Sequence, residues 1–361
     1  MNRVLIGVVF LSTFPLFIGD TCSYAQETLP EVPRDYDLSR LELSPERRGQ
    51  VATALRQKDY KKAEEILVAE TELDPKSLRA AKLLEFSGGL FFLDGQYVNS
   101  VIAWKKAEAI APLDERTRFT LAMACIKVNH RSWARSELQT LAAEHPNHTL
   151  YLYWLSRVDY DDQKYFEAIV RLHRVAELDP SMVRAYDLLG LCYDYTGQFD
   201  ESIKAFSRAV ELNRLQARPS PWPPLDMALT QLELNQLANA EKGLREAITY
   251  NPKLPQAQYQ LGRVLDKEGK SEEAIEALKR SAALDADYPD PHYLLGRIYQ
   301  RLGKNDLAKA ESLEFQRLKQ TTTAIPSCGA QKSRRVKKKI PDRYKSWSAR
   351  YLPCPFDSSQ W

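Results

Sequence analysis

The sequence predicts an all-α protein made of short helical hairpins stacked in series, and two observations lead to this prediction. Between Pro255 and Tyr288, apolar residues recur three and four apart in two runs, and a polar, glycine-centred KEGKSEE segment separates them. This is the pattern of two amphipathic helices joined by a tight turn. The same pattern returns thirty-four residues later, where Gly296 takes the place of Gly262.

The period continues back along the chain in register. We place eight repeats at Ser44–Ser77, Ala81–Asp114, Glu115–His148, Thr149–Met182, Val183–Gln216, Pro221–Leu254, Pro255–Tyr288 and Pro289 to about Lys319. The twentieth position is small in all of them: Ala63, Ser100, Ala134, Ala168, Ser202, Ala240, Ala274 and Ala308. Small side chains at fixed spacing are expected where two helices of a hairpin touch.

Two further positions support the register. The eighth position is small in repeats two to eight, and Val51 is the exception in the first repeat. The turn position is Gly or Asn in six of the eight repeats. Because one hairpin cannot bury its own apolar face, residues such as Trp104 and Phe206 are expected to be covered by neighbouring helices.

This spacing of Leu-Gly, Tyr, Ala, Phe and Pro resembles the tetratricopeptide repeat. The resemblance implies a right-handed α-solenoid of about eight repeats, in which the first helices line a concave groove that holds a protein or peptide partner. Positions two, five, nine, twelve and thirteen face the groove in that family. Here they supply Phe119, Met123, Tyr153, Arg157, Tyr160, Trp222, Tyr259, Arg263, Tyr293 and Arg297.

Three repeats carry the same Tyr and Arg four residues apart, at Tyr153/Arg157, Tyr259/Arg263 and Tyr293/Arg297. Residues at this spacing share one face of a helix. A flat ring beside a fork of donors suits a partner segment with acidic groups. The alternative is that these pairs merely stack along a solvated helix. No repeat has the Lys and Asn pair with which adaptors of the family clamp a terminal carboxylate.

The two ends of the chain do not follow the repeat. We assign 1–25 to a signal peptide cleaved after Ala25, because a positive start and the apolar run Val4–Gly19 precede small residues. The run is shorter than the roughly 20 residues that span a bilayer, although an uncleaved anchor remains the alternative. Residues 26–43 read as a linker. We therefore expect an exported protein, periplasmic or secreted.

The prolines at 217–220 and just beyond interrupt the array between 44–216, which holds repeats one to five, and 221–319, which holds repeats six to eight. Because proline fits only the first turn of a helix, the next helix is expected to begin near Pro224 and to be short. This joint is either a hinge or a longer loop with unchanged stacking.

The tail, residues 320–361, is basic and contains aromatic residues. The chain carries a net charge of +3, and residues 321–361 contain nine Lys or Arg against two Asp. In an exported protein these charges favour an anionic membrane surface or a cell-wall polymer over nucleic acid, so a tether is the alternative function. The other interpretation is a solvated, disordered tail. Cys328 and Cys354 flank the basic run and could pair.

Signals for catalysis and cofactors are weak. There is no phosphate-binding loop, nucleophile elbow or metal helix in the sequence. His145 and His148 lack further ligands for zinc, and the DADYPDP segment lacks the glycine and final glutamate of a calcium loop. Cys125 and Cys192 are expected to be buried and unbridged. We predict a non-catalytic scaffold in an envelope complex, without metal or cofactor and of undetermined oligomeric state.

Overall fold

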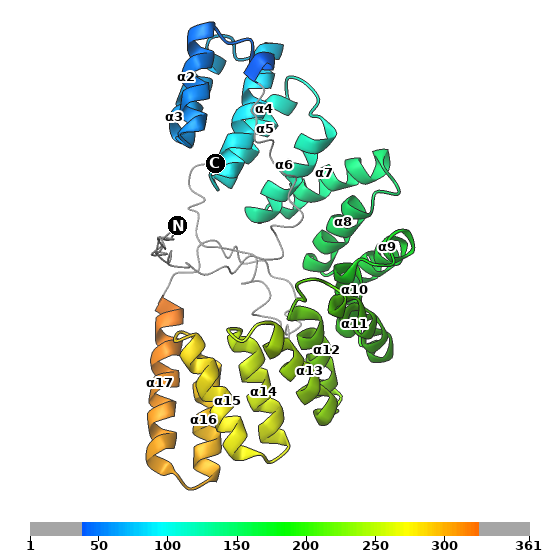
Figure 1. Cartoon of the computed structure of the whole chain (residues 1–361), viewed down its shortest axis with the longest axis vertical. Helices are drawn as coiled ribbons and strands as arrows, with labels where there is room; N and C mark the ends of the chain where they lie inside the picture. The colour runs from blue at the N-terminus through cyan, green and yellow to red at the C-terminus, as the bar shows by residue number, and fades with distance from the viewer. Residues whose placement is uncertain (1–37, 325–361) are drawn as a thin grey trace, which may run out of the picture. The chain divides into compact units, whose positions relative to one another are not determined.

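The structure is a computed structural model that describes residues 38–324. Within this range the protein is entirely helical, with one 3₁₀ helix, sixteen α-helices and no strand (Figure 1), so the predicted fold class is confirmed. The elements are η1 (Leu38–Leu41), α2 (Pro45–Arg56), α3 (Tyr60–Glu72), α4 (Leu78–Leu93), α5 (Tyr97–Glu108), α6 (Glu115–Lys127), α7 (Arg131–Glu144), α8 (Thr149–Asp161), α9 (Tyr165–Leu178), α10 (Val183–Tyr195), α11 (Phe199–Arg214), α12 (Trp222–Glu233), α13 (Leu237–Tyr250), α14 (Pro255–Lys267), α15 (Ser271–Leu284), α16 (Pro289–Arg301) and α17 (Asn305–Ala324).

Several predictions about the ends lie outside the described residues. These are the signal peptide and its cleavage after Ala25, the first part of the linker, the tail beyond Ala324, and the pairing of Cys328 with Cys354. Between residues 38 and 324, no helix combines the length and apolar character needed to cross a membrane.

The chain divides into two compact units, and α5 and α6 contribute residues to both. The first unit contains described residues 38–94 and 103–120. Its core includes Leu38, Leu41 and Leu43, which are buried with residues of α2, α3 and α4. The assignment of the whole segment 26–43 to a linker is therefore corrected, because residues 38–43 pack against the apolar side of the first repeat.

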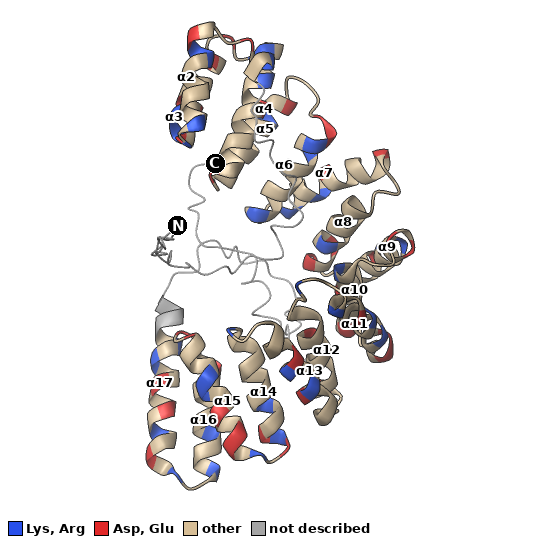
Figure 2. Ribbon diagram, viewed as in Figure 1, with Lys and Arg blue, Asp and Glu red and all other residues tan. Residues whose placement is uncertain are grey.

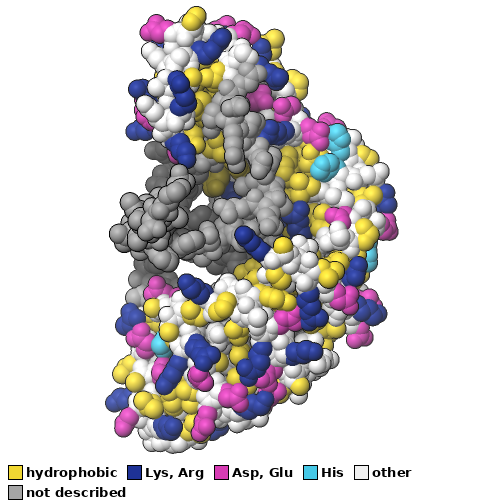
Figure 3. Space-filling view, viewed as in Figure 1, with side chains coloured by type: hydrophobic (Ala, Val, Ile, Leu, Met, Phe, Trp, Pro, Cys, Tyr) yellow, Lys and Arg dark blue, Asp and Glu magenta, His cyan; other side chains and the backbone are white. Residues whose placement is uncertain are grey.

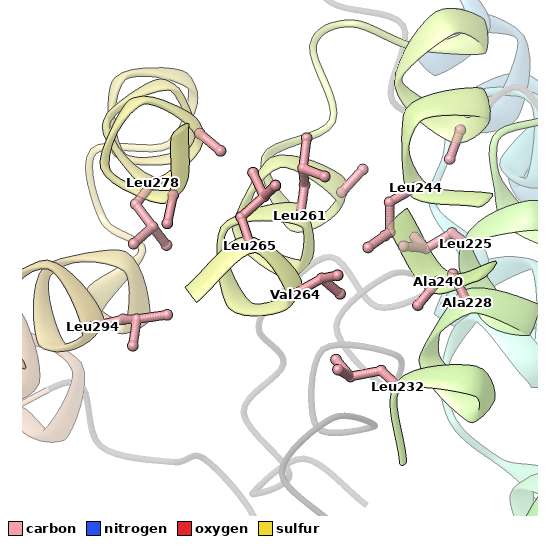
Figure 4. Packing of buried hydrophobic residues seen from close by; sticks show 14 of the residues in the cluster. Leu225, Ala228, Leu232, Ala240, Leu244, Leu261, Val264, Leu265, Leu278 and Leu294 are labelled. Carbon is pink, nitrogen blue, oxygen red and sulfur yellow. The ribbon is translucent and has the colours of Figure 1, made fainter. Parts of the chain in front are cut away.

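The second unit contains described residues 95–102 and 121–324. Its helices pack in consecutive pairs, and each first helix also contacts the first helix of the next pair, from α8 through α10, α12 and α14 to α16. One continuous apolar cluster joins α12–α16, with residues such as Leu232, Val264 and Leu294 pointing into the space between the helices (Figure 4). At the seam between α10 and α12, the hydroxyl of Thr230 donates a buried hydrogen bond of 2.8 Å to Asp194.

The small eighth position is explained by close contact between the two helices of a pair. A Cβ atom added to Gly190 would lie 2.6 Å from the ring of Phe206, and one added to Gly88 would lie 2.5 Å from the indole of Trp104. Gly262 meets Leu278 at 2.6 Å in the same way. These distances are shorter than side chains tolerate, so the predicted register of the first and second helices is confirmed at these repeats.

The turn inside each hairpin always adopts a left-handed backbone. The fifteenth position of every repeat has a positive φ, from +57° to +78°: Lys58, Gly95, Asn129, Gln163, Gly197, Asn235, Gly269 and Gly303. Glycine and asparagine reach this region at little cost. Lys58 and Gln163 adopt it at a higher cost, because their side chains disfavour a positive φ. At these two positions the geometry of the repeat therefore determines the backbone conformation.

The proline-rich joint is a longer loop with the stacking preserved. Helix α12 begins at Trp222 rather than near Pro224, because Pro223 and Pro224 fit within its first turn. It packs against both α10 and α11. Asn213 closes the loop, because its side-chain amide donates to the carbonyl of Ser220 and its oxygen accepts from the Ser220 amide, both at 2.8 Å.

Arg214 gives this joint a second brace. The residue stands where other repeats carry a helix-ending proline, and its guanidinium makes a two-pronged contact with Glu246 of α13 at 2.6 and 2.7 Å. The hydrogen bond from Arg214 lowers the pKa of Glu246, against the opposing effect of burial. Arg214, which replaces the helix-ending proline, thus links α11 to α13 through its ion pair with Glu246.

Candidate protein-binding face

The ten residues predicted to line a groove lie on five first helices, α6, α8, α12, α14 and α16. Phe119 and Met123 are both 4% exposed, and they belong to different units although both lie on α6. Trp222 is half-buried at the start of α12 and packs against the apolar cluster of α12–α16. These three residues contribute mainly to packing.

In the fourth repeat, Arg157 is already engaged. Its side chain is 10% exposed and forms an ion pair of 3.3 Å with Asp161, one turn further along α8. Its guanidinium lies over the ring of Tyr160 at 5.6 Å. Tyr153 is instead covered by Arg184 of α10, at 4.7 Å. In this repeat Arg157 therefore has a carboxylate partner, and Tyr153 has a cation from the next first helix over its ring.

Tyr160 belongs to a packed aromatic cluster with Tyr165 and Tyr195. The rings of Tyr165 and Tyr195 stack at 4.9 Å, and Tyr160 meets each of them edge-on at 5.6 Å. Burial raises the pKa of Tyr165 to about 12, so its phenol stays neutral. Cys192 beside it is buried and free, as predicted, and burial raises the pKa of its thiol. This part of α8–α10 is a well-packed core region.

In the last two repeats the predicted pairs are present. Arg263 lies over the ring of Tyr259, and Arg297 lies over the ring of Tyr293, each at 6.0 Å. Tyr293 is 51% exposed and Arg297 is exposed, whereas Tyr259 and Arg263 are half-buried. Basic, acidic and apolar side chains are interspersed over α14–α17 (Figures 2 and 3).

Neither of these two arginines is neutralised within residues 38–324. The Arg263 guanidinium donates to the amide oxygen of Gln260 at 2.7 Å, and no carboxylate of the described chain lies within ion-pair distance of Arg263 or Arg297. The residues four positions on, which correspond to Asp161 in the fourth repeat, are Lys267 and Arg301. A like charge at this spacing cannot form an ion pair with the arginine.

Aromatic neighbours that the sequence analysis missed extend this surface. Tyr288 meets Tyr259 edge-on at 5.3 Å, and Phe315 of α17 lies against Tyr293 at 5.3 Å. Lys319 lies over Phe315 at 5.6 Å. The equivalent residues of the two preceding repeats are Ala247 and Ser281, which are small. The large aromatic residue at this position was the feature of the sequence that could have identified Phe315 as part of the surface.

We name the surface formed by Tyr259, Arg263, Tyr293, Arg297 and Phe315 the Tyr–Arg face. Its chemistry is that of one half-buried and one exposed guanidinium group, each lying over an aromatic ring and neither paired with a carboxylate of the described residues. Such a surface can recognise carboxylates beside apolar or ring-containing groups. It offers no nucleophile and no general base.

The histidine pair considered for a metal serves packing instead. The rings of His148 and Tyr151 stack at 3.8 Å, and His145 meets Tyr151 edge-on at 6.1 Å. Tyr151 itself is buried. Across the described part of the chain, no group of three or more His, Cys, Asp or Glu is placed to hold a metal ion.

Tetratricopeptide-repeat models match residues 183–215 and 289–322, and a TPR-repeat model matches residues 263–303. No curated protein matches the sequence.

Solved structures of the same fold are more distant in sequence. A tetratricopeptide repeat protein from Parabacteroides merdae is 17% identical, with a TM-score of 0.54 over 74% of this chain and 98% of that one. PilW, a type IV pilus biogenesis factor, is 16% identical, with a TM-score of 0.52 over 58% of this chain and all of that one. A chain of the APC/C hetero-tetramer Cut9–Hcn1 is 15% identical, with a TM-score of 0.52 over 74% of this chain and 52% of that one. With the repeat models matching its fifth, seventh and eighth helix pairs, this chain is a tetratricopeptide-repeat protein.

Proposed function

We propose that this protein is a non-catalytic scaffold that binds an acidic segment of another protein on the Tyr–Arg face. The observation that carries the proposal is the contrast between Arg157, which is buried in an ion pair, and Arg263 and Arg297, which rest on tyrosine rings without a carboxylate of the described chain. Exposed Tyr and Arg together are enriched among residues that dominate binding energy at interfaces.

The setting we propose is the cell envelope. The support for export is the N-terminal sequence, with a positive start, a short apolar run and small residues before Ala25. An exported scaffold would meet its partner in an assembly outside the cytoplasm. Cell fractionation of the full-length chain, with N-terminal sequencing of the mature protein, tests this placement, and a chain that begins at Met1 in the cytoplasm would contradict it.

The binding proposal is tested with two double variants of equal charge change. Arg263→Gln with Arg297→Gln removes the two cations of the face, whereas Arg280→Gln with Arg317→Gln removes two exposed cations from α15 and α17 that already pair with Glu276 and Glu314. Crosslinking in the native cell, followed by mass spectrometry, should show a partner attached near α14 and α16.

We expect this crosslink to be lost in the first double variant and kept in the second. Circular dichroism of both variants would confirm that each remains folded. A crosslink that persists in the first variant, or one that maps only to helices other than α14, α16 and α17, would contradict the assignment of the face.

A further inference from the structure

The two Tyr–Arg pairs are held at a fixed spacing from each other. They occupy the same repeat positions on α14 and α16, and these two first helices contact each other directly. Packed helices have axes about 8–10 Å apart. Equivalent side chains on the two helices are therefore displaced by about this distance, and a single segment crossing both helices meets the same ring and the same guanidinium twice.

Few backbone conformations place equivalent side chains at that step on one face. In a β-strand, residues two apart share a face at only about 7 Å, and residues three apart point to opposite faces. In a polyproline II helix, with three residues per turn and a rise of about 3.1 Å, residues three apart share a face at about 9 Å. An α-helix reaches about 10.5 Å with residues seven apart, so it would present only one acidic group per two turns.

The chemistry of the face also favours the polyproline II form. Aromatic surfaces hold proline-rich segments because the rings pack against the flat pyrrolidine groups. Tyr293 is 51% exposed and presents such a ring, with Phe315 extending it. The polyproline II backbone makes no internal hydrogen bonds, so its carbonyl groups can accept from the tyrosine hydroxyls and guanidinium groups.

We infer that the Tyr–Arg face reads a polyproline II segment that carries Asp or Glu at every third residue. Successive carboxylates pair with Arg263 and Arg297, and the prolines between them pack on Tyr259 and Tyr293. The inference rests on the proposed function and adds to it the conformation of the partner and the spacing of its acidic groups.

Synthetic peptides of identical composition test this spacing. One peptide repeats Glu-Pro-Pro, so that its carboxylates are three residues apart, and two others place the same residues with carboxylates two and four apart. Binding of each labelled peptide to the full-length chain is followed by fluorescence anisotropy at low and at physiological salt. We expect the three-residue spacing to bind about tenfold more tightly than either of the others, a factor equivalent to about 1.4 kcal/mol.

The variants identify the residues that impose the spacing. Arg297→Gln should remove the preference among the peptides, whereas Arg280→Gln should keep it, because Arg280 lies on α15 and pairs with Glu276. Equal affinity for all three spacings would overturn the inference.

The failure of the inference differs from the failure of the proposed function. If no peptide binds while the cellular crosslink still depends on Arg263 and Arg297, the face binds its partner in another conformation and the spacing rule is wrong. If neither the peptides nor the crosslink depend on these arginines, the proposed function fails as well.

Discussion

The fourth repeat and the last two repeats carry the same Tyr and Arg spacing on their first helices, yet they use it differently. On α8, Arg157 is buried against Asp161, and Tyr153 is covered by Arg184 of the next repeat. On α14 and α16, each arginine rests on its own tyrosine. The difference shows that the same spacing gives different surroundings to the arginine, depending on whether an acidic residue follows it one turn later.

The same contrast holds for buried charge. Asp159 of α8 is 1% exposed and pairs with Arg135 of α7 and Arg171 of α9, so it ties three helices together. Asp266 of α14 pairs with Arg301, whose side chain is 52% exposed. The Asp159 network is therefore more deeply buried than the pair between Asp266 and Arg301.

The largest expected effect separates these two aspartates. Asp159→Ala removes the shared carboxylate of Arg135 and Arg171, although Arg135 keeps its ion pair with Asp162. Breaking a buried pair costs about 3 kcal/mol. Asp266→Ala removes an ion pair that solvent screens, at a cost below about 1 kcal/mol. Urea unfolding followed by circular dichroism compares the two variants, and equal losses would contradict the distinction between the regions.

A smaller effect is expected from one added methyl group. Gly190→Ala would place a Cβ atom 2.6 Å from the ring of the fully buried Phe206, and such overpacking costs about 1–3 kcal/mol. Gly296→Ala meets the Ser312 hydroxyl at 3.3 Å, which can rotate away, and alanine favours the helix by up to about 1 kcal/mol. The melting temperature should fall for Gly190→Ala and rise for Gly296→Ala. An equal fall in both variants would contradict the difference in helix contact between the two positions.

The smallest expected effect concerns the hairpin turns. Gln163 has φ +61° after α8, whereas Gly269 has φ +78° after α14. Gln163→Gly should stabilise the fold by up to about 1 kcal/mol, because a non-glycine residue pays a penalty of about that size in the left-handed region. Gly269→Gln is the reciprocal change and should destabilise by a similar amount. Chemical denaturation gives the free energy of unfolding of both variants, and a lower value for Gln163→Gly than for the unchanged protein would contradict the assigned turn.

Much of the fold could be predicted because one repeat constrains the next. The left-handed turn recurs at the same position in all eight repeats, even at Lys58 and Gln163, where the residue type gives no signal. The small eighth position predicts contacts such as Gly190 with Phe206. Period and residue size are local properties, and they are sufficient to place both helices of each hairpin.

Two features were harder to predict from the sequence: the residues that cover the first repeat and the residue at which α12 begins. Leu38, Leu41 and Leu43 are too few to show a period, and their burial depends on the open side of α2–α4. The prolines around Pro224 permit several starting points for the helix, and the choice of Trp222 is fixed by the loop that Asn213 closes.

The geometry of the Tyr–Arg face could be predicted in part from the sequence. Helical spacing places Tyr259 with Arg263 and Tyr293 with Arg297, but it places Tyr153 with Arg157 equally well. The sequence did contain the discriminating residue, which is Asp161 in one repeat and Lys267 or Arg301 in the others. Burial of Arg157 and the cover of Tyr153 by Arg184 come from the neighbouring repeat, and periodicity within one helix does not report them.

The loop before α12 marks where this architecture accepts new sequence. Asn213 and Ser220 fasten its two ends to each other, and Leu215 between them is 83% exposed. A reporter or a tag inserted into this loop would extend from the surface between Asn213 and Ser220, and the packing of the helices before and after the loop would be kept. The irregular stretch thus provides an attachment point for a label in the binding experiments proposed above.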